Sequence, residues 1–377
     1  MQRIYLDNNA TTRLLPAVQE AMNQAWENAF ANPGSQHSFG RDARRSLEDS
    51  REEIATLLDA DPSELVFTSG GTEAINMAVH GLTAGRTGTL LLTAGEHPAT
   101  VQACLTASQR GNVRLTLPVE SDGLVSPARL NQIPWDSVRL VCVILAHNET
   151  GIIQNTETLA AECERRGIPL LLDAVQAVGK IPVSFRGLRA TALAFGAHKF
   201  HGPRGIGGLL IRNGVRLPPL LEGGHQEAGR RAGTEPVPLI VGMASALREF
   251  HNNAEQRTPL IRQMRDRLQS LLQQNCGPVA VHGEHSPRLP NTLSIAFPGV
   301  SGEALLVNLH LAEVACSLGS TCASGSAEPA PALLAMGIPP QICTSTVRFS
   351  LSIMNSESEM EEAARRISEC VNRVRGS

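Results

Sequence analysis

The sequence predicts an α/β protein, with a large domain on a mixed, mostly parallel sheet and a smaller α+β domain. Three observations support this fold class. Between residues 64 and 208, short and nearly continuous apolar runs alternate with helix-like stretches, as in strands that are covered on both faces. A long helical pattern follows over residues 236–274. Beyond it, short strand patterns and helix patterns are interleaved in a smaller unit.

Two helices are predicted before the first strand, over residues 16–29 and 40–59. The second is rich in Arg and Glu, so it should be partly exposed. Strands of the large unit are predicted at 64–68, 89–93, 140–145, 170–172 and 208–211. Helices between these strands are predicted at 72–83, 97–109 and 156–166.

The helix over residues 236–274 is expected to break near Pro259, because proline has no N–H to donate within a helix. In the smaller unit, strands are predicted at 279–282, 291–297, 313–317 and 346–352, and helices at 301–310, 329–336 and 356–375. We therefore predict a large domain over residues 13–250 and a small domain that consists of residues 251–377 together with residues 1–12.

Composition excludes several classes of protein. A hydrophobic fraction of 42% is typical of an ordinary globular chain, and a net charge of -3 gives no general attraction to nucleic acid or an anionic membrane. The longest apolar run, residues 140–146, is too short to cross a bilayer, and the N-terminus lacks the apolar region of a secretory signal. A cytoplasmic location is predicted. The eight cysteines are scattered without a Cys-x-x-Cys pair, so most should be reduced thiols.

Lys199 and Asp173 form the most informative pair of residues, because each follows a short apolar run that is typical of a strand. Pyridoxal phosphate needs a lysine amine for its Schiff base and an anion beside its protonated ring nitrogen. A lone lysine is usually a surface charge, and a lone aspartate is often a turn residue. Together they predict a pyridoxal phosphate site.

A phosphate group could bind at residues 69–73, where Gly70, Gly71 and Thr72 follow a strand and open a helix. The same residues are common in helix capping, so this pattern gains weight only beside the lysine and the aspartate. His97 has two interpretations, as a helix cap or as a ring that lies on the cofactor. His198 and His201 have helical spacing for a metal, but no third ligand is near, and no metal is expected.

Cys322 lies in a run of small residues, GSTCASGSAEP, where a core position is improbable and a thiolate could reach a substrate. Cys316, six positions earlier, is interpreted as a structural thiol or, less favoured, as a disulfide partner. Arg348 is a charge in an apolar strand and should face a carboxylate. The pattern leaves open whether that carboxylate is a structural residue or part of a substrate.

With these motifs, the chain resembles the cysteine desulfurases of the class V aminotransferase family, group I, which includes the nitrogen-fixation and general iron-sulfur-cluster enzymes. The resemblance extends from residues 5–12 and 32–37 to the strand at Arg348. It rests on EHPA at 96–99, HNETG at 147–151, DAVQAVGK at 173–180, HKFHGPRGIG at 198–207, GGHQEAGRRAGTE at 223–235 and GSTCASGSAEP at 319–329.

The resemblance implies a fold type I homodimer, with Lys199 carrying the Schiff base and Asp173 holding the ring nitrogen. It also implies a set of further roles. Gln176 would bond the ring hydroxyl, His97 would stack on the ring, and the phosphate would be held by Gly71, Thr72, His198 and, from the other subunit, Thr234. Asn148 and Arg348 would bind the carboxylate of L-cysteine, and Cys322 would take its sulfur, leaving L-alanine and an enzyme persulfide for an acceptor or scaffold protein.

Two departures from the family pattern stand out. Relatives commonly have a phosphate-binding Ser two positions before the His of the lysine motif, where this chain has Gly196. After the strand of Arg348, the chain has Ser352, Ile353 and Met354 in place of Gly or Ser, Arg and an aromatic residue. The alternative functions are a selenocysteine lyase, another pyridoxal phosphate lyase or aminotransferase, or a non-catalytic partner in assembly.

Overall fold

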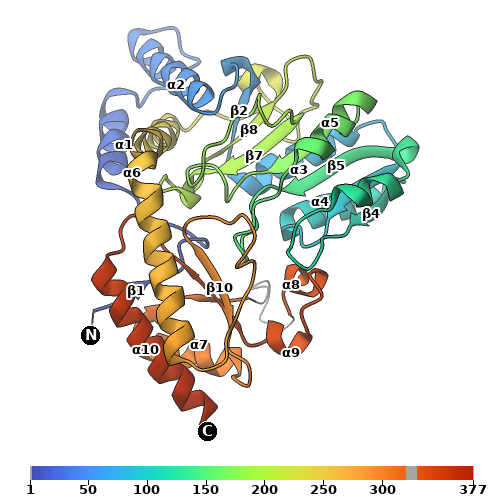
Figure 1. Ribbon diagram of the computed structural model, residues 1–377. Helices are drawn as coiled ribbons and strands as arrows, with labels where there is room; N and C mark the ends of the chain where they lie inside the picture. The colour runs from blue at the N-terminus through green and yellow to red at the C-terminus, as the bar shows by residue number, and fades with distance from the viewer. Residues whose placement is uncertain (1, 320–328, 377) are drawn as a thin grey trace.

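The large unit is built on a seven-stranded sheet in the computed structural model, which describes residues 2–319 and 329–376 (Figure 1). Its strands are β2 (Leu65–Thr68), β3 (Thr89–Thr93), β4 (Val113–Leu117), β5 (Val138–Ile144), β6 (Leu170–Asp173), β7 (Ala192–Gly196) and β8 (Gly207–Ile211). The order is β2-β8-β7-β6-β5-β3-β4, in which β8 runs antiparallel to both of its neighbours and the other pairs are parallel. The predicted α/β class with a mixed, mostly parallel sheet is confirmed.

Helices cover both faces of this sheet, as the nearly continuous apolar strands predicted. They are α1 (Pro16–Asn28), α2 (Ser38–Leu57), α3 (Gly71–Thr83), α4 (Pro98–Ser108) and α5 (Glu157–Arg166). Alternate residues of each strand serve the two faces: Leu90 and Leu92 of β3 pack with α3 and α4, whereas Leu91 packs in the cluster that contains α2 and α5. Edge strand β4, which no predicted strand included, is mostly exposed and so lacks the continuous apolar pattern.

A single helix, α6 (Val237–Asn275), leads from the large unit to the small one, and it runs through Pro259 without the predicted break (Figure 1). The helix is exposed around Pro259, with Leu260 54% accessible. Water can therefore bond the backbone carbonyl that proline leaves without a donor, and the helix continues.

The small unit holds a four-stranded antiparallel sheet in the order β12-β13-β10-β9. Its strands are β9 (Ala280–Val281), β10 (Thr292–Ala296), β12 (Ser317–Leu318) and β13 (Thr346–Ser350), and its helices are α7 (Gly302–Leu311), α8 (Pro331–Ala335), α9 (Pro340–Cys343) and α10 (Glu357–Arg375). The strand predicted over residues 313–317 is in fact two strands. Its first part, β11 (Val314–Ala315), pairs with β1 (Ile4–Tyr5), because the chain changes sheet at Cys316 before β12 joins β13.

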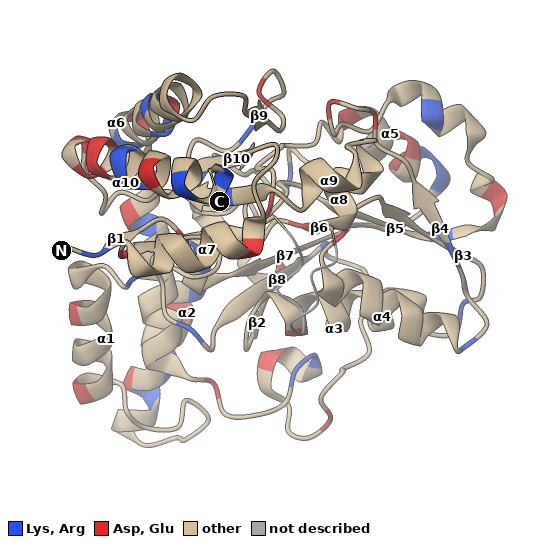
Figure 2. Ribbon diagram, turned by 90° about the horizontal axis from the view of Figure 1, so that it is seen from below, with Lys and Arg blue, Asp and Glu red and all other residues tan. Residues whose placement is uncertain are grey.

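Short 3-10 helices complete the described chain: η1 (Pro62–Glu64), η2 (Pro127–Gln132), η3 (Trp135–Ser137), η4 (Ala197–Lys199) and η5 (Gln226–Gly229). On the surface, basic and acidic residues alternate along α10 (Figure 2). Arg365 pairs there with Glu362 and Glu369, at 2.7 and 2.6 Å. No helix among the described residues is both long and apolar enough to span a membrane.

Candidate active site

Lys199 and Asp173 come together because their strands are neighbours. β6 and β7 run parallel, so that Asp173, the last residue of β6, pairs with Ala194, and Lys199 follows directly after β7 in η4. The carboxyl ends of parallel strands are the usual place for a ligand in an open α/β sheet. Lys199 donates from Nζ to the carbonyls of Asn9 at 2.7 Å and Ala10 at 2.8 Å. Burial, and then the charge of Arg348, lowers the pKa of Lys199 to about 8.

Asp173 is 5% exposed, and its Oδ1 accepts a hydrogen bond from the Val175 N–H at 3.0 Å. Burial raises the pKa of this carboxyl, while the Val175 bond and the fields of His97 and Lys199 oppose the rise. Its Oδ2 has no hydrogen bond within the described residues. A protonated ring nitrogen would supply the missing donor and favour the charged carboxylate, so this residue fits pyridoxal phosphate.

His97 is the N-cap residue of α4, where its Nδ1 accepts from the Ala99 N–H at 3.1 Å. The capping interpretation is therefore correct for this ring nitrogen. The ring is only half-buried, and its burial lowers the pKa of His97 while Asp173 opposes that shift. The ring is thus neutral under ordinary conditions and keeps a face for a flat ligand.

Glu96, beside His97, is a buried carboxyl for which the sequence predicted no role. Its Oε1 accepts from the Ile144 N–H at 2.6 Å and from the Thr93 hydroxyl, whereas its Oε2 is buried without a partner. Burial raises the pKa of Glu96 to about 8, and the nearby Asp173 adds to the rise. Its place as the first residue of the EHPA motif was the only signal for it in the sequence.

The predicted phosphate-binding residues, 69–73, lie at the N-terminus of α3 and are called the phosphate cup below. The first bond of the helix runs from Ala74 N to Gly70 O at 3.1 Å, so the N–H groups of Gly71 and Thr72 have no partner within the helix. The Ser69 N–H is taken, because it donates to Glu73 Oε2 at 2.6 Å. A Cβ on Gly71 would collide with the side chain of Val175, so glycine is needed at this position.

His198 lies next to this cup and close to the N-terminal segment. Its Nδ1 is 3.2 Å from Thr11 Oγ1, and its carbonyl accepts from the Thr12 N–H at 3.0 Å. Burial, with a further contribution from Lys199, lowers the pKa of His198 to about 4. The neutral ring can therefore donate one hydrogen bond to a phosphate oxygen without carrying a charge.

Arg348, on β13, faces a structural carboxylate. Its Nη2 donates to Asp7 Oδ1 at 2.7 Å and its Nη1 donates to the Asn148 carbonyl at 3.0 Å, and the side chain is 8% exposed. The Nε is buried and has no partner among the described residues. An unpaired guanidinium N–H is costly, so an acceptor such as a substrate carboxylate would complete the site.

Asn9, for which the sequence predicted no role, connects these groups. Its carbonyl accepts from Gln176 Nε2 at 2.9 Å as well as from Lys199, and its Nδ2 donates to Thr292 Oγ1 at 2.9 Å. Asn9 is 1% exposed. Gln176 and Lys199 of the large unit are thereby held against β10 of the small one, with the motif at residues 5–12 as the only signal in the sequence.

Two of the predicted residues are not joined to this cluster. Thr234 is exposed between η5 and α6, and no hydrogen bond links it to the other site residues within the described chain. Cys322 lies outside the described residues.

Burial raises the pKa of Cys316 to about 12, as expected of a structural thiol. No group of three or more His, Cys, Asp or Glu residues suited to a metal occurs in the described ranges.

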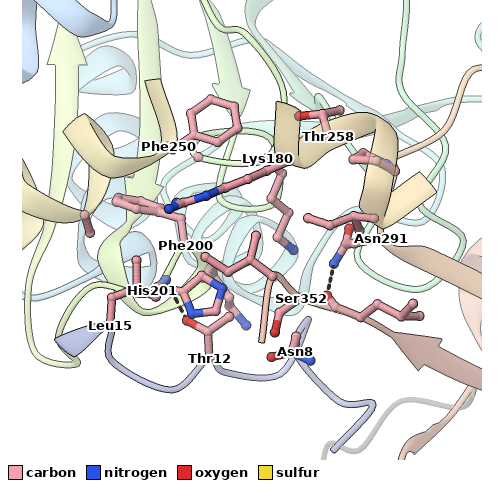
Figure 3. Close-up of a pocket in the computed structure, with 18 residues that line it drawn as sticks. Asn8, Thr12, Leu15, Lys180, Phe200, His201, Phe250, Thr258, Asn291 and Ser352 are labelled. Carbon is pink, nitrogen blue, oxygen red and sulfur yellow. Dashed lines mark hydrogen bonds between the residues drawn. The ribbon is translucent and has the colours of Figure 1, made fainter. Parts of the chain in front are cut away.

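A pocket borders the site on the side where the two units meet (Figure 3). Lys180, Lys199 and Phe200 line it from the large unit, and Asn291 and Ser352 line it from the small unit. The site thus has contributions from the large unit, the small unit and the N-terminal segment.

A lysine and an aspartate at the carboxyl edge of an α/β sheet are typical of pyridoxal-phosphate-dependent enzymes. Comparison with known families gives the same class. The family model described as aminotransferase class-V matches residues 4–362. The chain belongs to this family, whose members are pyridoxal-phosphate-dependent enzymes.

Among curated relatives, a cysteine desulfurase of Enterobacter agglomerans is 41% identical over 100% of this chain and 94% of its own length. The cysteine desulfurase NifS of Azotobacter vinelandii is 38% identical over the same shares. Among solved structures, a NifS-like protein has a TM-score of 0.91 and 34% identity, over 98% of this chain and 100% of its own. SspA in complex with cysteine has a TM-score of 0.81 and 28% identity, over 93% and 99% of the two chains.

Proposed function

We propose that this protein is a cysteine desulfurase, which removes sulfur from L-cysteine, releases L-alanine and holds the sulfur as a persulfide on Cys322. The observation that carries the proposal is the meeting of the Lys199 amine and the Asp173 carboxylate at the carboxyl edge of the sheet. It occurs in a chain that is 41% identical to a cysteine desulfurase over its full length. Bound pyridoxal phosphate supplies the chemistry by withdrawing electrons from the substrate carbons.

The residues of the site have separate tasks in this proposal. Lys199 binds the cofactor through Nζ, and the pKa of about 8 leaves a useful fraction of neutral amine for that attachment and for moving protons. Asp173 holds the ring nitrogen, Gln176 the ring hydroxyl, and His97 covers the ring. The phosphate is bound by Gly71, Thr72 and His198.

Arg348 and Asn148 bind the carboxylate of L-cysteine. The support for this step is the buried Nε of Arg348, which has donor capacity left after Asp7 and the Asn148 carbonyl are satisfied. The bonds to Asp7 and the Asn148 carbonyl fix the guanidinium in direction, so its remaining N–H would orient a carboxylate better than a mobile lysine would.

We further propose a homodimer in the cytoplasm, in which Thr234 of the partner subunit completes the phosphate site. Support comes from the exposure of Thr234 in a single chain, since a phosphate ligand must lie beside the cup at Gly71. The sulfur then passes to an acceptor or scaffold protein for cluster, cofactor or thiolated tRNA synthesis.

The division into domains is proposed as residues 13–250 and residues 251–377 with 1–12. It is supported by the apolar clusters. Ile4 and Leu6 pack with Leu293, Phe349 and other residues beyond 260, whereas the clusters around the seven-stranded sheet draw almost entirely on residues 18–247.

Turnover of L-cysteine in the presence of a thiol reductant tests the function, with alanine and sulfide measured together. The Cys322→Ala variant is expected to keep the visible absorbance of the bound cofactor and to lose sulfide release. Lys199→Ala is expected to lose that absorbance. The matched control is Cys316→Ala, whose half-buried thiol should not matter for turnover. Undiminished sulfide release by Cys322→Ala would contradict the persulfide step.

A further inference from the structure

The chain contains 33 basic residues, and only two of them, Lys180 and Lys199, are lysines. Both lysines lie at the same site. Lys180 Nζ donates to Asn9 Oδ1 at 2.8 Å, and Lys199 Nζ donates to the carbonyl of the same asparagine at 2.7 Å. Arginine occupies every other basic position, so a lysine at 180 indicates a need for a compact ammonium rather than a planar guanidinium.

Lys180 is 9% exposed, and its hydrogen-bond partners are the neutral amide oxygens of Asn9 and Gln176. Within residues 2–319 and 329–376 no carboxylate forms an ion pair with it. Burial, followed by the charges of Lys199 and Arg348, lowers the pKa of Lys180. An isolated buried ammonium is costly, so an anion from outside the chain is expected nearby.

Two further titratable groups, His198 and His201, face Lys180. Burial is the largest cause of the lowered pKa of each histidine, and Lys180 adds to it. Neither ring can serve as the missing anion, because an imidazole is either neutral or positively charged. The bound cofactor is the remaining candidate, because its ring hydroxyl ionises.

Gln176 would connect Lys180 to the ring hydroxyl. The amide oxygen of Gln176 accepts from Lys180, while its Nε2 donates to the Asn9 carbonyl at 2.9 Å. An amide whose oxygen is held by an ammonium is fixed in orientation, and its NH2 group has a second hydrogen to give. Figure 3 shows Lys180 extending toward Asn291, whose Nδ2 donates to Asn9 Oδ1 at 3.1 Å.

We propose that Lys180 is a positioning residue for the cofactor: it fixes the Gln176 amide that faces the ring hydroxyl and places a positive charge behind it. The inference rests on the proposed function, since it takes Lys199 as the lysine that binds the cofactor. Asn9 bonds to both lysines and to Thr292 of the small unit. One residue therefore positions the Gln176 amide and the Lys199 amine relative to the small unit.

The test is a pH titration of the visible absorbance of the cofactor-loaded protein without substrate. Bound pyridoxal phosphate changes colour when it gains a proton, and a nearby positive charge disfavours that gain. In Lys180→Met the midpoint is therefore expected to rise by about one pH unit, from the loss of one partly screened charge. Lys180→Gln, which keeps an N–H donor without the charge, is expected to shift in the same direction and replaces the Met variant if that one does not fold.

Arg257→Met is the matched control, because Arg257 lines the same pocket but donates to Glu249 rather than to Asn9 or Gln176. Its midpoint should equal that of the wild type. The proposal is overturned if the Lys180 variants titrate like the wild type, or if Arg257→Met shifts as much as they do. If the wild-type protein binds no cofactor, the proposed function itself fails, which separates the two outcomes.

Discussion

Lys199 has lost part of the water that would stabilise its ammonium, and Arg348 repels the charge further. The resulting pKa of about 8 follows from burial first, because the attraction of Asp7 and Asp173 is the smaller effect. The same cause acts with the opposite sign on carboxyls: burial raises the pKa of Glu96 to about 8. A site with little water therefore brings an acid and a base into the same pH range.

The rate at which the apoprotein takes up pyridoxal phosphate is predicted to rise with pH and to level off above about pH 8, the pKa of Lys199. Only the neutral amine attacks the aldehyde, and its fraction falls about tenfold for each pH unit below the pKa. Stopped-flow absorbance after mixing apoprotein with cofactor measures this rate. A rate that still climbs tenfold per unit above pH 9 would show an unshifted lysine.

Arg348→Lys is predicted to raise the KM for L-cysteine by about ten- to a hundredfold, with a smaller change in kcat. A lysine cannot keep the bonds to Asp7 and the Asn148 carbonyl and still offer a directed donor to the substrate, and a charged hydrogen bond contributes about 1.5–3 kcal/mol. Steady-state kinetics measure the effect. Arg366→Lys is the control, because that buried arginine bonds the carbonyls of Gln2 and Ala312 rather than a residue of the site. An unchanged KM would remove Arg348 from substrate binding.

The sequence indicated Lys199 and Asp173 because their chemistry is specific and their position after apolar runs is visible locally. It did not indicate Asn9 or Glu96. Asn9 has its role through Thr292, 283 positions away, and Glu96 through Ile144. Contacts of that separation depend on the completed fold, and an asparagine or a glutamate in a loop carries no local sign of them.

At the scale of elements, strands and helices with a strong apolar pattern were predicted to within a few residues. The errors occur where neighbours override the pattern. Edge strand β4 is exposed and so lacks the pattern of a buried strand, residues 313–317 divide between two sheets, and Pro259 lies inside α6 because water can bond the exposed turn. Local propensity cannot report which sheet will accept a strand.

The junction of β7 and η4 offers a second prediction at this scale. A Cβ at Gly196 would lie 3.3 Å from Gly71 N, beside the phosphate cup, and the extended backbone at Gly196 accepts any residue. Gly196→Ser is therefore predicted to tighten pyridoxal phosphate binding several-fold, since one hydroxyl bond to a charged group contributes about 1.5–3 kcal/mol and part of it is lost to local adjustment.

Equilibrium dialysis or fluorescence titration of the apoprotein measures this affinity. Gly196→Ala introduces the same Cβ without the hydroxyl, so it separates crowding from hydrogen bonding. Weaker binding by both variants would mean that the Cβ itself disturbs the cup, and that Gly196 is required for space.

At the scale of the whole molecule, the large unit provides the cofactor residues, the small unit provides Arg348, and Asn9 contacts both. In the proposed homodimer, Thr234, which is exposed in one chain, would reach the phosphate site of the second copy. A single chain would then hold an incomplete site, and activity would depend on assembly.

Subunit complementation tests this dependence. Lys199→Ala and Thr234→Val should each be poorly active alone, because the first lacks the amine and the second lacks the partner's phosphate ligand. After co-refolding in equal amounts, about half of the dimers are mixed, and each mixed dimer has one intact site, so about a quarter of wild-type activity is expected. Wild-type protein treated alike is the control. Activity that merely averages the two variants would place Thr234 in its own subunit's site.

The N-terminal segment has one more consequence, for the order in which the protein is made. Asn8 and Asn9 bond to Ser350, more than 340 positions away, at 2.8 and 2.9 Å. During synthesis on the ribosome, Asn8 and Asn9 emerge long before β13 is made. Domains made early can fold while later ones are still missing. The seven-stranded sheet can therefore form during synthesis, whereas Asn9, which anchors Lys199, is held in place only after Ser350 has emerged. Cofactor capture is therefore expected to follow the synthesis of β13, so that a chain without this strand would not hold the reactive aldehyde firmly.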